Sequence, residues 1–250
     1  CSVGSWSVSL GGITGGNFDA VASTVFNGPL SAFNSMFAIQ AASLASPGVG
    51  TANFLLESAA FGPLVKGLLL SQGSPDFQAF LMGTFGTTDV TEAQLVGAVN
   101  GFLAALSPEQ LAGANALFNQ FAFAAQTVID SADPINYFTA LANNTPVHMM
   151  TVIGDGGDNL PDQVIPVTTA APLAGQQALA NIMGLQQISS TKVGTPSISG
   201  IVKFVEGGHA SSLIRVSSED VTVEMQREVA NYFGSNGTAI VITNEAVVAN

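Results

Sequence analysis

The spacing of apolar and polar positions predicts three short buried strands separated by helical segments. Apolar runs cover Phe37–Leu44, Val147–Ile153 and Ile201–Val205, and glycine-containing turns follow the last two. Runs of this length are typical of strands that are buried on both faces of a parallel sheet. Residues 2–16 are rich in Gly and Ser around a short apolar centre, and the pattern becomes helical after Leu10.

The segments between and after these strands carry N-terminal helix signals. They are capping boxes, a proline at the first helical position, or a capping serine before acidic residues. The signals are Thr91 with Gln94, Ser107 with Gln110, Ser74 before Pro75, Asp133 before Pro134, and Ser218 before Glu219 and Asp220. The acidic residues after Ser218 suit the positive end of a helix dipole. Alternation of strands, loops and helices predicts the α/β class.

The middle third of the chain, roughly Thr51 to Asn144, is predicted to be helical and has little charge for a solvated face. Apolar residues recur there at helical spacing, from Leu111 through Phe118 to Val128. One interpretation is a buried helix pair that fills a core. The other is an apolar cap over a hydrophobic pocket, which contacts lipid when it opens.

Composition narrows the classes of function. Lys and Arg number 5 against 17 Asp and Glu, so the net charge is −12, and only 9% of residues are charged. A chain with this charge repels a phosphate backbone, which excludes nucleic-acid binding. The uncharged stretches between Asp19 and Glu57 and between Glu109 and Asp130 are broken by polar residues, so no transmembrane segment is expected. A single cysteine, Cys1, excludes an internal disulfide and a multi-cysteine metal site.

Three short motifs contain residues that suit nucleophilic catalysis. Ser9 lies in Ser-Val-Ser-Leu-Gly, a near match to the nucleophile-elbow pattern G-x-S-x-G, in which small flanking residues let strand and helix approach. The loop after the Val147 strand offers one of three aspartates, Asp155, Asp158 or Asp162, and the loop after the Ile201 strand offers His209. The order Ser, Asp, His is that of α/β-hydrolases.

In this arrangement Ser9 attacks an ester carbonyl, His209 takes and returns the proton, and the aspartate orients the imidazole. The backbone N–H of Leu10 then serves the oxyanion hole. His148, inside a predicted strand, is interpreted as a structural histidine. A calcium loop over Asp155 to Asp162 is a further option, although its spacing does not match known calcium loops. We expect no cofactor and no bound metal in the reaction.

These motifs together resemble extracellular lipases and phospholipases of Gram-negative bacteria, of the virulence-factor lipase type. The resemblance covers about Val8 to Phe233 and is weak in the helical middle. It rests on Ser-Leu-Gly-Gly-Ile-Thr-Gly from Ser9, Asp-Gln-Val-Ile-Pro from Asp162, and Gly-Gly-His-Ala-Ser-Ser-Leu around His209. It implies a mostly parallel α/β-hydrolase sheet and the triad Ser9, Asp162 and His209, with Asp158 and Asp155 as second and third choices for the acid. It also implies a lipid ester substrate at a lipid–water interface, and an extracellular or outer-membrane location.

The same resemblance divides one catalytic domain into three parts. Residues 1–50 hold the elbow, the following helix and the next strand; residues 51–144 form a helical cap or lid; residues 145–250 carry the acid and the histidine. Only eight residues precede Ser9, whereas an α/β-hydrolase builds several strands and its second oxyanion donor before the elbow. We therefore expect the C-terminal half of a lipase, with weak or no activity by itself.

A non-catalytic alternative also fits the sequence. In that hypothesis the chain is a secreted or surface-anchored interaction module on a hydrolase-like scaffold, lipid-anchored through Cys1, and its Ser, Asp and His are incidental loop residues. The two hypotheses differ in one geometric expectation: only the enzyme requires Ser9, His209 and a carboxylate within hydrogen-bond reach of one another.

Overall fold

The computed structural model describes residues 3–31 and 37–250, so Cys1, proposed above as a lipid anchor, lies outside the described residues. The strands are β1 Val3–Val8, β2 Ile39–Ala45, β3 Val147–Val152, β4 Lys192–Val193, β5 Gly200–Phe204 and β6 Ala239–Ile240. The α-helices are α1 Leu10–Phe26, α2 Thr51–Glu57, α3 Gly62–Gly73, α4 Pro75–Phe85, α5 Glu92–Ala105, α6 Pro108–Ile129, α7 Phe138–Asn144, α8 Gln176–Ile182 and α9 Glu219–Gly234. Short 3₁₀ turns lie at Asp130–Ala132, Pro134–Asn136 and Glu245–Val247.

The centre of the fold is a parallel sheet in the order β1-β2-β3-β5, and all three strand pairs are parallel. Its strands follow the predicted apolar runs, although β2 begins at Ile39 rather than at Phe37. The α/β class predicted from the sequence is therefore confirmed. β1 lies in the Gly- and Ser-rich stretch, for which no strand was predicted, and it is the first strand in the order of the sheet. β4 and β6 form a separate antiparallel pair.

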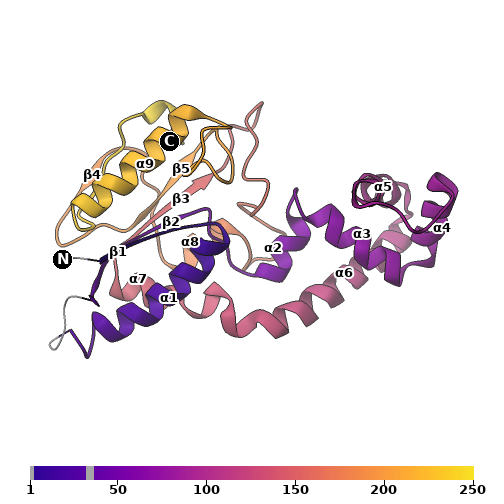
Figure 1. Cartoon of the computed structure of the whole chain (residues 1–250), viewed down its shortest axis with the longest axis horizontal. Helices are drawn as coiled ribbons and strands as arrows, with labels where there is room; N and C mark the ends of the chain where they lie inside the picture. Colours follow the sequence, from indigo (N-terminus) through magenta and orange to yellow (C-terminus); the bar gives the residue numbers. More distant parts are fainter. Residues whose placement is uncertain (1–2, 32–36) are drawn as a thin grey trace.

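Helices cover both faces of the sheet, which explains why its strands are apolar on both sides (Figure 1). On one face, α9 packs through Val221, Met225 and Tyr232 against Met150 and Phe204. The other face is covered by α1, α7 and α8, whose buried side chains include Ala20, Phe138, Leu141 and Leu179. Because all strands run in one direction, their carboxyl ends meet at one edge of the sheet.

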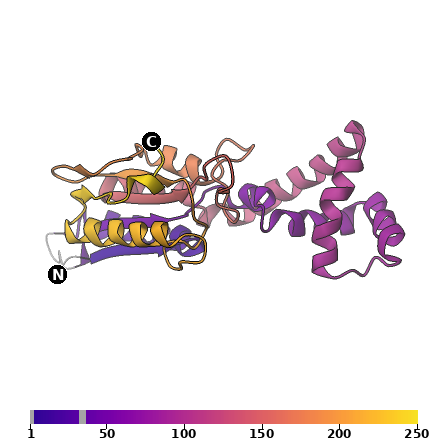
Figure 2. The same cartoon turned by 90° about the horizontal axis from the view of Figure 1, so that it is seen from above.

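The predicted helical middle is confirmed as helical, and most of it projects from the sheet as an arm formed by α3, α4, α5 and α6 (Figures 1 and 2). The arm has its own apolar core, which runs from Leu56 through Phe77 and Phe102 to Phe118 and Ala122. The last helix of the segment, α7, packs instead against α1 on the sheet. These helices therefore fill a core of their own, separate from the core of the sheet.

The predicted N-terminal helix signals are also confirmed. Thr91 and Ser107 each form a complete capping box, and the hydroxyls of Ser74 and Ser218 accept a hydrogen bond from the third residue of their helix. Asp133 caps a 3₁₀ turn rather than an α-helix. These caps satisfy helix N–H groups locally, so they could be identified from sequence spacing alone.

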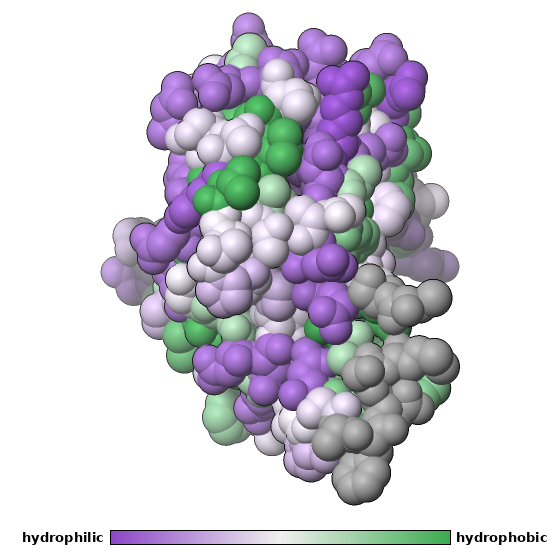
Figure 3. Space-filling view, turned by 90° about the vertical axis from the view of Figure 1, so that its left-hand side faces the viewer, coloured by the Kyte–Doolittle hydropathy of each residue, from purple (hydrophilic) through white to green (hydrophobic). Residues whose placement is uncertain are grey.

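No single helix among the described residues is long and apolar enough to cross a membrane. Only α2 and α3 together meet the criteria of length and hydropathy, and the pair is bent by 95°. At the opposite end of the molecule from the arm, polar side chains are interspersed with separate apolar patches (Figure 3).

Asp133 joins the two connections between the sheet and the arm. Its carboxylate accepts hydrogen bonds from the backbone N–H groups of Gly50, Thr51 and Ile135 and from the side chain of Gln126. Burial raises the pKa of this carboxyl, but the hydrogen bonds lower it by more, so the pKa lies below its ordinary value of 3.8. The ionised form is therefore the form that stabilises the junction.

Asp133→Ala is expected to lower the free energy of unfolding by about 2–4 kcal/mol at neutral pH, because it leaves several buried donors without an acceptor. The pKa of Asp133 is lower in the folded state than in the unfolded state. The stabilisation that its carboxylate provides is therefore fully present above pH 3.8 and is lost as the pH falls through the folded-state pKa. Denaturant unfolding at a series of pH values measures both effects. Asp89→Asn, an exposed carboxylate on the arm, is the control; equal stability of Asp133→Ala and wild type would contradict this assignment.

Candidate active site

Ser9 lies in the sharp turn between β1 and α1. Its backbone has φ 58° and ψ −129°, which is a strained conformation for a residue with a side chain. Such a conformation costs about 1–3 kcal/mol, and residues that adopt it cluster at functional sites. The Ser9 N–H donates to the carbonyl of Ala45, at the end of β2, at 2.9 Å. Leu10 begins α1, so its N–H has no partner inside the helix and is free to serve a ligand.

The glycines that allow this turn differ from those expected from the elbow pattern. A Cβ at Gly11 would contact nothing within 4 Å, so the expectation that Gly11 is required for close approach is wrong. The close approaches occur one to two turns further along α1: a Cβ at Gly15 would lie 3.0 Å from Ser7, and one at Gly16 would lie 2.2 Å from the Phe138 ring. These glycines let α1 pack closely onto β1 and α7.

His209 follows β5 in a glycine loop. Gly207 has φ 110°, which favours glycine, and a Cβ there would lie 2.9 Å from the hydroxyl of Ser211. That hydroxyl accepts a hydrogen bond from the Gly208 N–H at 2.8 Å and so fixes the loop. The side chain of His209 is 15% exposed, which leaves the imidazole accessible at the carboxyl edge of the sheet.

Asp162 follows β3 at the same edge and is buried. Its Oδ1 accepts the N–H groups of Val164 at 2.8 Å and Ile165 at 3.1 Å, and its own N–H donates to the carbonyl of Val152. These bonds fix the carboxylate from the backbone of its own loop. Its second oxygen, Oδ2, is thereby directed toward His209.

The structure brings the three residues into one continuous chain of hydrogen bonds. Ser9 Oγ lies 2.6 Å from His209 Nε2, and His209 Nδ1 lies 2.7 Å from Asp162 Oδ2. Each residue follows a different strand of the parallel sheet, so the shared carboxyl edge explains how positions 9, 162 and 209 meet. A serine, an imidazole and a carboxylate in this order can generate a nucleophilic alkoxide and then protonate a leaving group.

The other two aspartates considered from the sequence are not part of this chain. Asp155 is exposed, and its carboxylate accepts hydrogen bonds from Gly157 and Asn159 within its own loop. The Gly157 N–H foremost lowers the pKa of the Asp155 carboxyl. Asp158 is exposed. In the part of the chain that the structure describes, no three His, Cys, Asp or Glu side chains group as they would around a metal ion.

One contributor to the site carried no sequence signal that we used. Gln176, at the start of α8, is fully buried, and its Nε2 donates to Asp162 Oδ2 at 2.8 Å and to the carbonyl of Ile165 at 2.6 Å. It therefore contacts the same oxygen as His209 does. In the sequence nothing distinguishes Gln176 from the neighbouring Gln177, so only the structure identifies it.

His148 lies away from the triad, between the sheet and α9. It is fully buried, with Nδ1 3.1 Å from Ser43 Oγ and Nε2 2.9 Å from Glu228 Oε2. Burial raises the pKa of the Glu228 carboxyl, and the bond to His148 opposes that shift. These contacts fit the structural interpretation of His148.

Comparisons with protein-family models, with curated proteins and with solved structures find no match for this chain.

Proposed function

We propose that the protein is a serine carboxylic ester hydrolase that cleaves acyl esters of lipids through an acyl-enzyme. The observation that carries the proposal is the chain from Ser9 Oγ through His209 to the buried Asp162 carboxylate, with separations of 2.6 and 2.7 Å. Strain at Ser9 and the free N–H of Leu10 add to it, because both are features of a nucleophile at a strand-to-helix turn. We accordingly propose an α/β-hydrolase scaffold.

The proposed reaction proceeds in two steps. His209 Nε2 takes the proton of Ser9 as Oγ bonds to the ester carbonyl carbon, and the Leu10 N–H donates to the resulting oxyanion. Collapse breaks the bond to the alcohol oxygen, which receives the proton from His209. Water then attacks the acyl-enzyme by the same route and releases the carboxylic acid and Ser9. Asp162 holds Nδ1–H throughout and stabilises the imidazolium.

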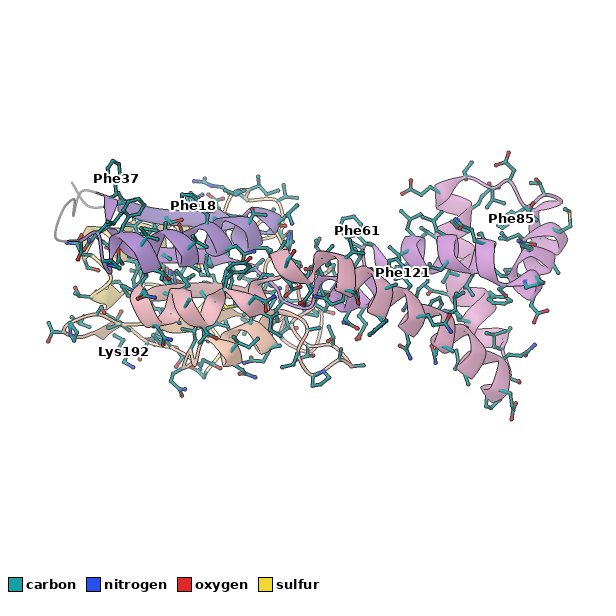
Figure 4. The ribbon with its side chains drawn as sticks, turned by 90° about the horizontal axis from the view of Figure 1, so that it is seen from below. Phe18, Phe37, Phe61, Phe85, Phe121 and Lys192 are labelled. Atoms are coloured by element: carbon teal, nitrogen blue, oxygen red, sulfur yellow. The ribbon has the colours of Figure 1, made fainter. Side chains whose placement is uncertain are left out.

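A lipid substrate is favoured by the arm beside the site. The arm and its base expose large apolar side chains, including Phe123 at 77% and Val128 at 80% exposure. Phe61, 47% exposed, lies where the arm meets the sheet unit (Figure 4). Phe121 and Phe85 are instead half-buried against the core of the arm. Exposed apolar side chains of this kind suit contact with an acyl chain or a lipid–water interface. Together with the resemblance noted above, they support an extracellular or outer-membrane lipase or phospholipase.

The rate is expected to be low. β1 is an edge strand, so within the described residues no strand lies on its far side to bring a second N–H toward the oxyanion. One such donor contributes about 100- to 1,000-fold in kcat. Hydrolysis of p-nitrophenyl butyrate and of an emulsified triacylglycerol tests the proposal: slow hydrolysis that depends on His209 supports it. Hydrolysis unaffected by His209→Ala would contradict the assigned triad, and a wild-type rate no faster than the uncatalysed reaction would favour the non-catalytic module.

Gln176→Met is expected to reduce kcat about 10-fold with little change in KM, because the carboxylate that orients His209 loses one of its donors and small errors in position are costly. Met keeps the length of the side chain and removes its amide. Gln177→Met is the matched control, since the neighbouring amide contacts Asn181 and not Asp162. Steady-state kinetics with p-nitrophenyl butyrate measures the effect. Equal kcat for the two variants would contradict a role of Gln176 in positioning Asp162.

A further inference from the structure

The segment between α2 and α3, residues 58–61, is the root of the arm (Figure 1). Two donors of this segment meet one carbonyl group in the loop that carries Asp162. The Ala60 N–H donates to the carbonyl of Gln163 at 2.8 Å, and the hydroxyl of Ser58 donates to the same oxygen at 3.2 Å. The root of the arm is therefore hydrogen-bonded to the residue that directly follows the acid of the triad.

The Gln163 carbonyl belongs to the same peptide group as the Val164 N–H. That N–H donates to Asp162 Oδ1 at 2.8 Å. Because a trans peptide group is planar, its C=O and N–H bonds point in opposite directions, and a contact that fixes one of them also fixes the other. The root of the arm thus holds one side of a peptide group whose other side holds the carboxylate.

A second connection between the acid and the start of the arm runs through Ile165. Its N–H donates to the same Asp162 oxygen at 3.1 Å, and its side chain packs in a buried apolar cluster with Phe54 of α2 and Ile13 of α1. α2 ends at Glu57, directly before the root of the arm. The two N–H groups that bind Oδ1 are therefore both placed by contacts with α2 or with the root of the arm.

Ser58 is the side chain that joins these parts. It is 2% exposed, and its hydroxyl accepts the Phe61 N–H at 3.1 Å while it donates to the Gln163 carbonyl. A hydroxyl has one proton to donate and two lone pairs, so both bonds form at the same time. Phe61 directly precedes α3. One buried hydroxyl thus connects the first residues of the arm with the Asp162 loop.

We propose that Ser58 is a positioning residue for the acid of the triad. Through the peptide group of residues 163 and 164 it holds the Asp162 carboxylate so that Oδ2 faces His209 Nδ1, 2.7 Å away. The two oxygens of a carboxylate are rigidly joined, so an error at Oδ1 is passed on to Oδ2. The inference rests on the proposed function, in which Asp162 orients the imidazole. Ser58 itself contacts neither His209 nor the nucleophile.

Ser58→Ala is expected to lower kcat for p-nitrophenyl butyrate about 5-fold with little change in KM, because a small displacement of the acid misplaces the imidazole. Ser71→Ala is the matched control. The Ser71 hydroxyl is half-buried and donates to the Gly67 carbonyl within α3, so its loss leaves the Asp162 loop untouched. A merely structural role for Ser58 would lower the midpoint of thermal unfolding and leave kcat of the folded chain unchanged.

Proton NMR of the chain labelled with ¹⁵N-histidine gives a readout that needs no substrate. The chain has two histidines, and a ring N–H that donates to a carboxylate gives a far-downfield resonance. The His209 resonance, identified by its absence from His209→Ala, should move upfield in Ser58→Ala as the bond to Asp162 weakens. The His148 resonance is the internal control, because His148 bonds to Glu228 between the sheet and α9, and it should not move.

Hydrogen exchange tests the connecting peptide group itself. The Val164 amide should exchange about 5-fold faster in Ser58→Ala than in wild type, because the carbonyl on the other side of its peptide group loses a donor. The Asp162 amide donates to the Val152 carbonyl at the end of β3, so it should exchange at the wild-type rate. Ser71→Ala should leave both rates unchanged.

The inference is overturned if Ser58→Ala keeps the wild-type kcat, His209 resonance and Val164 exchange rate, and the proposed hydrolase function then stands without it. A wild-type chain without a downfield His209 resonance would contradict the bond to Asp162 and would overturn the inference as well. If Ser58→Ala moves the resonance in a chain that hydrolyses no ester, the positioning contact is supported and the proposed function alone is wrong.

Discussion

Ser9→Ala is expected to reduce kcat/KM for an activated acyl ester by about 10⁴- to 10⁶-fold, since it removes the nucleophile of the proposed triad. His209→Ala should reduce kcat/KM about as much, because His209 Nε2, 2.6 Å from Ser9 Oγ, is the base that takes the proton of the nucleophile. Residues that act as one unit are not additive. The double variant should therefore be no slower than either single variant, measured with p-nitrophenyl butyrate.

Ser190→Ala is the matched control for this series. Ser190 is exposed and lies in a loop away from the triad, so its loss removes a hydroxyl without touching the site. Its kcat/KM should equal that of wild type within twofold. If Ser9→Ala retained most of the activity, hydrolysis would belong to another residue and the assigned site would be wrong. If the two single effects multiplied, Ser9 and His209 would not act as one unit.

Asp162→Asn is expected to reduce kcat by about 10³- to 10⁴-fold with a small change in KM. The substitution keeps the shape of a buried side chain, but an amide that donates to Nδ1 favours the wrong imidazole tautomer. The loop should persist, because the amide oxygen still accepts the N–H groups of Val164 and Ile165. Single-turnover kinetics and thermal unfolding separate lost chemistry from lost stability.

Asp158→Asn and Asp155→Asn are the controls for Asp162→Asn, since both residues lie in the preceding loop and neither contacts His209. Each should keep kcat within about threefold of wild type, which is small against the loss expected for an orienting acid. A large loss in Asp158→Asn together with a small loss in Asp162→Asn would assign the acid to a rearranged loop. It would also mean that the 2.7 Å contact between Asp162 and His209 does not serve the reaction.

Much of the fold was predictable because its signals are local. β3 and β5 are buried on both faces, so each is a short continuous apolar run that the sequence shows by itself. The capping boxes at Thr91 and Ser107 satisfy backbone groups within three residues. The start of β2 was misplaced by two residues, because Phe37 is apolar but lies outside the sheet and is exposed.

The site was predictable to the extent that strand order constrains it. Asp162 and His209 each follow a predicted strand, and a parallel sheet places such residues at one edge. No strand was predicted before Ser9, which was identified only through the elbow pattern and the order of the three residues. Gln176 was not predictable, because it reaches Asp162 from a helix whose position depends on tertiary packing. The role of Gly15 and Gly16 was missed for the same reason: the atoms they approach belong to β1 and α7. The direction in which the arm projects also had no local signal.

The central claim is that Ser9 is an activated nucleophile, and labelling with a fluorophosphonate probe tests it most directly. Mass spectrometry of the labelled chain should place one adduct on Ser9, with no adduct in Ser9→Ala and a labelling rate reduced at least 100-fold in His209→Ala. Ser190→Ala should label as wild type does. Absence of any adduct in the folded wild-type chain, or an adduct on another serine, would contradict the account and favour a non-catalytic module.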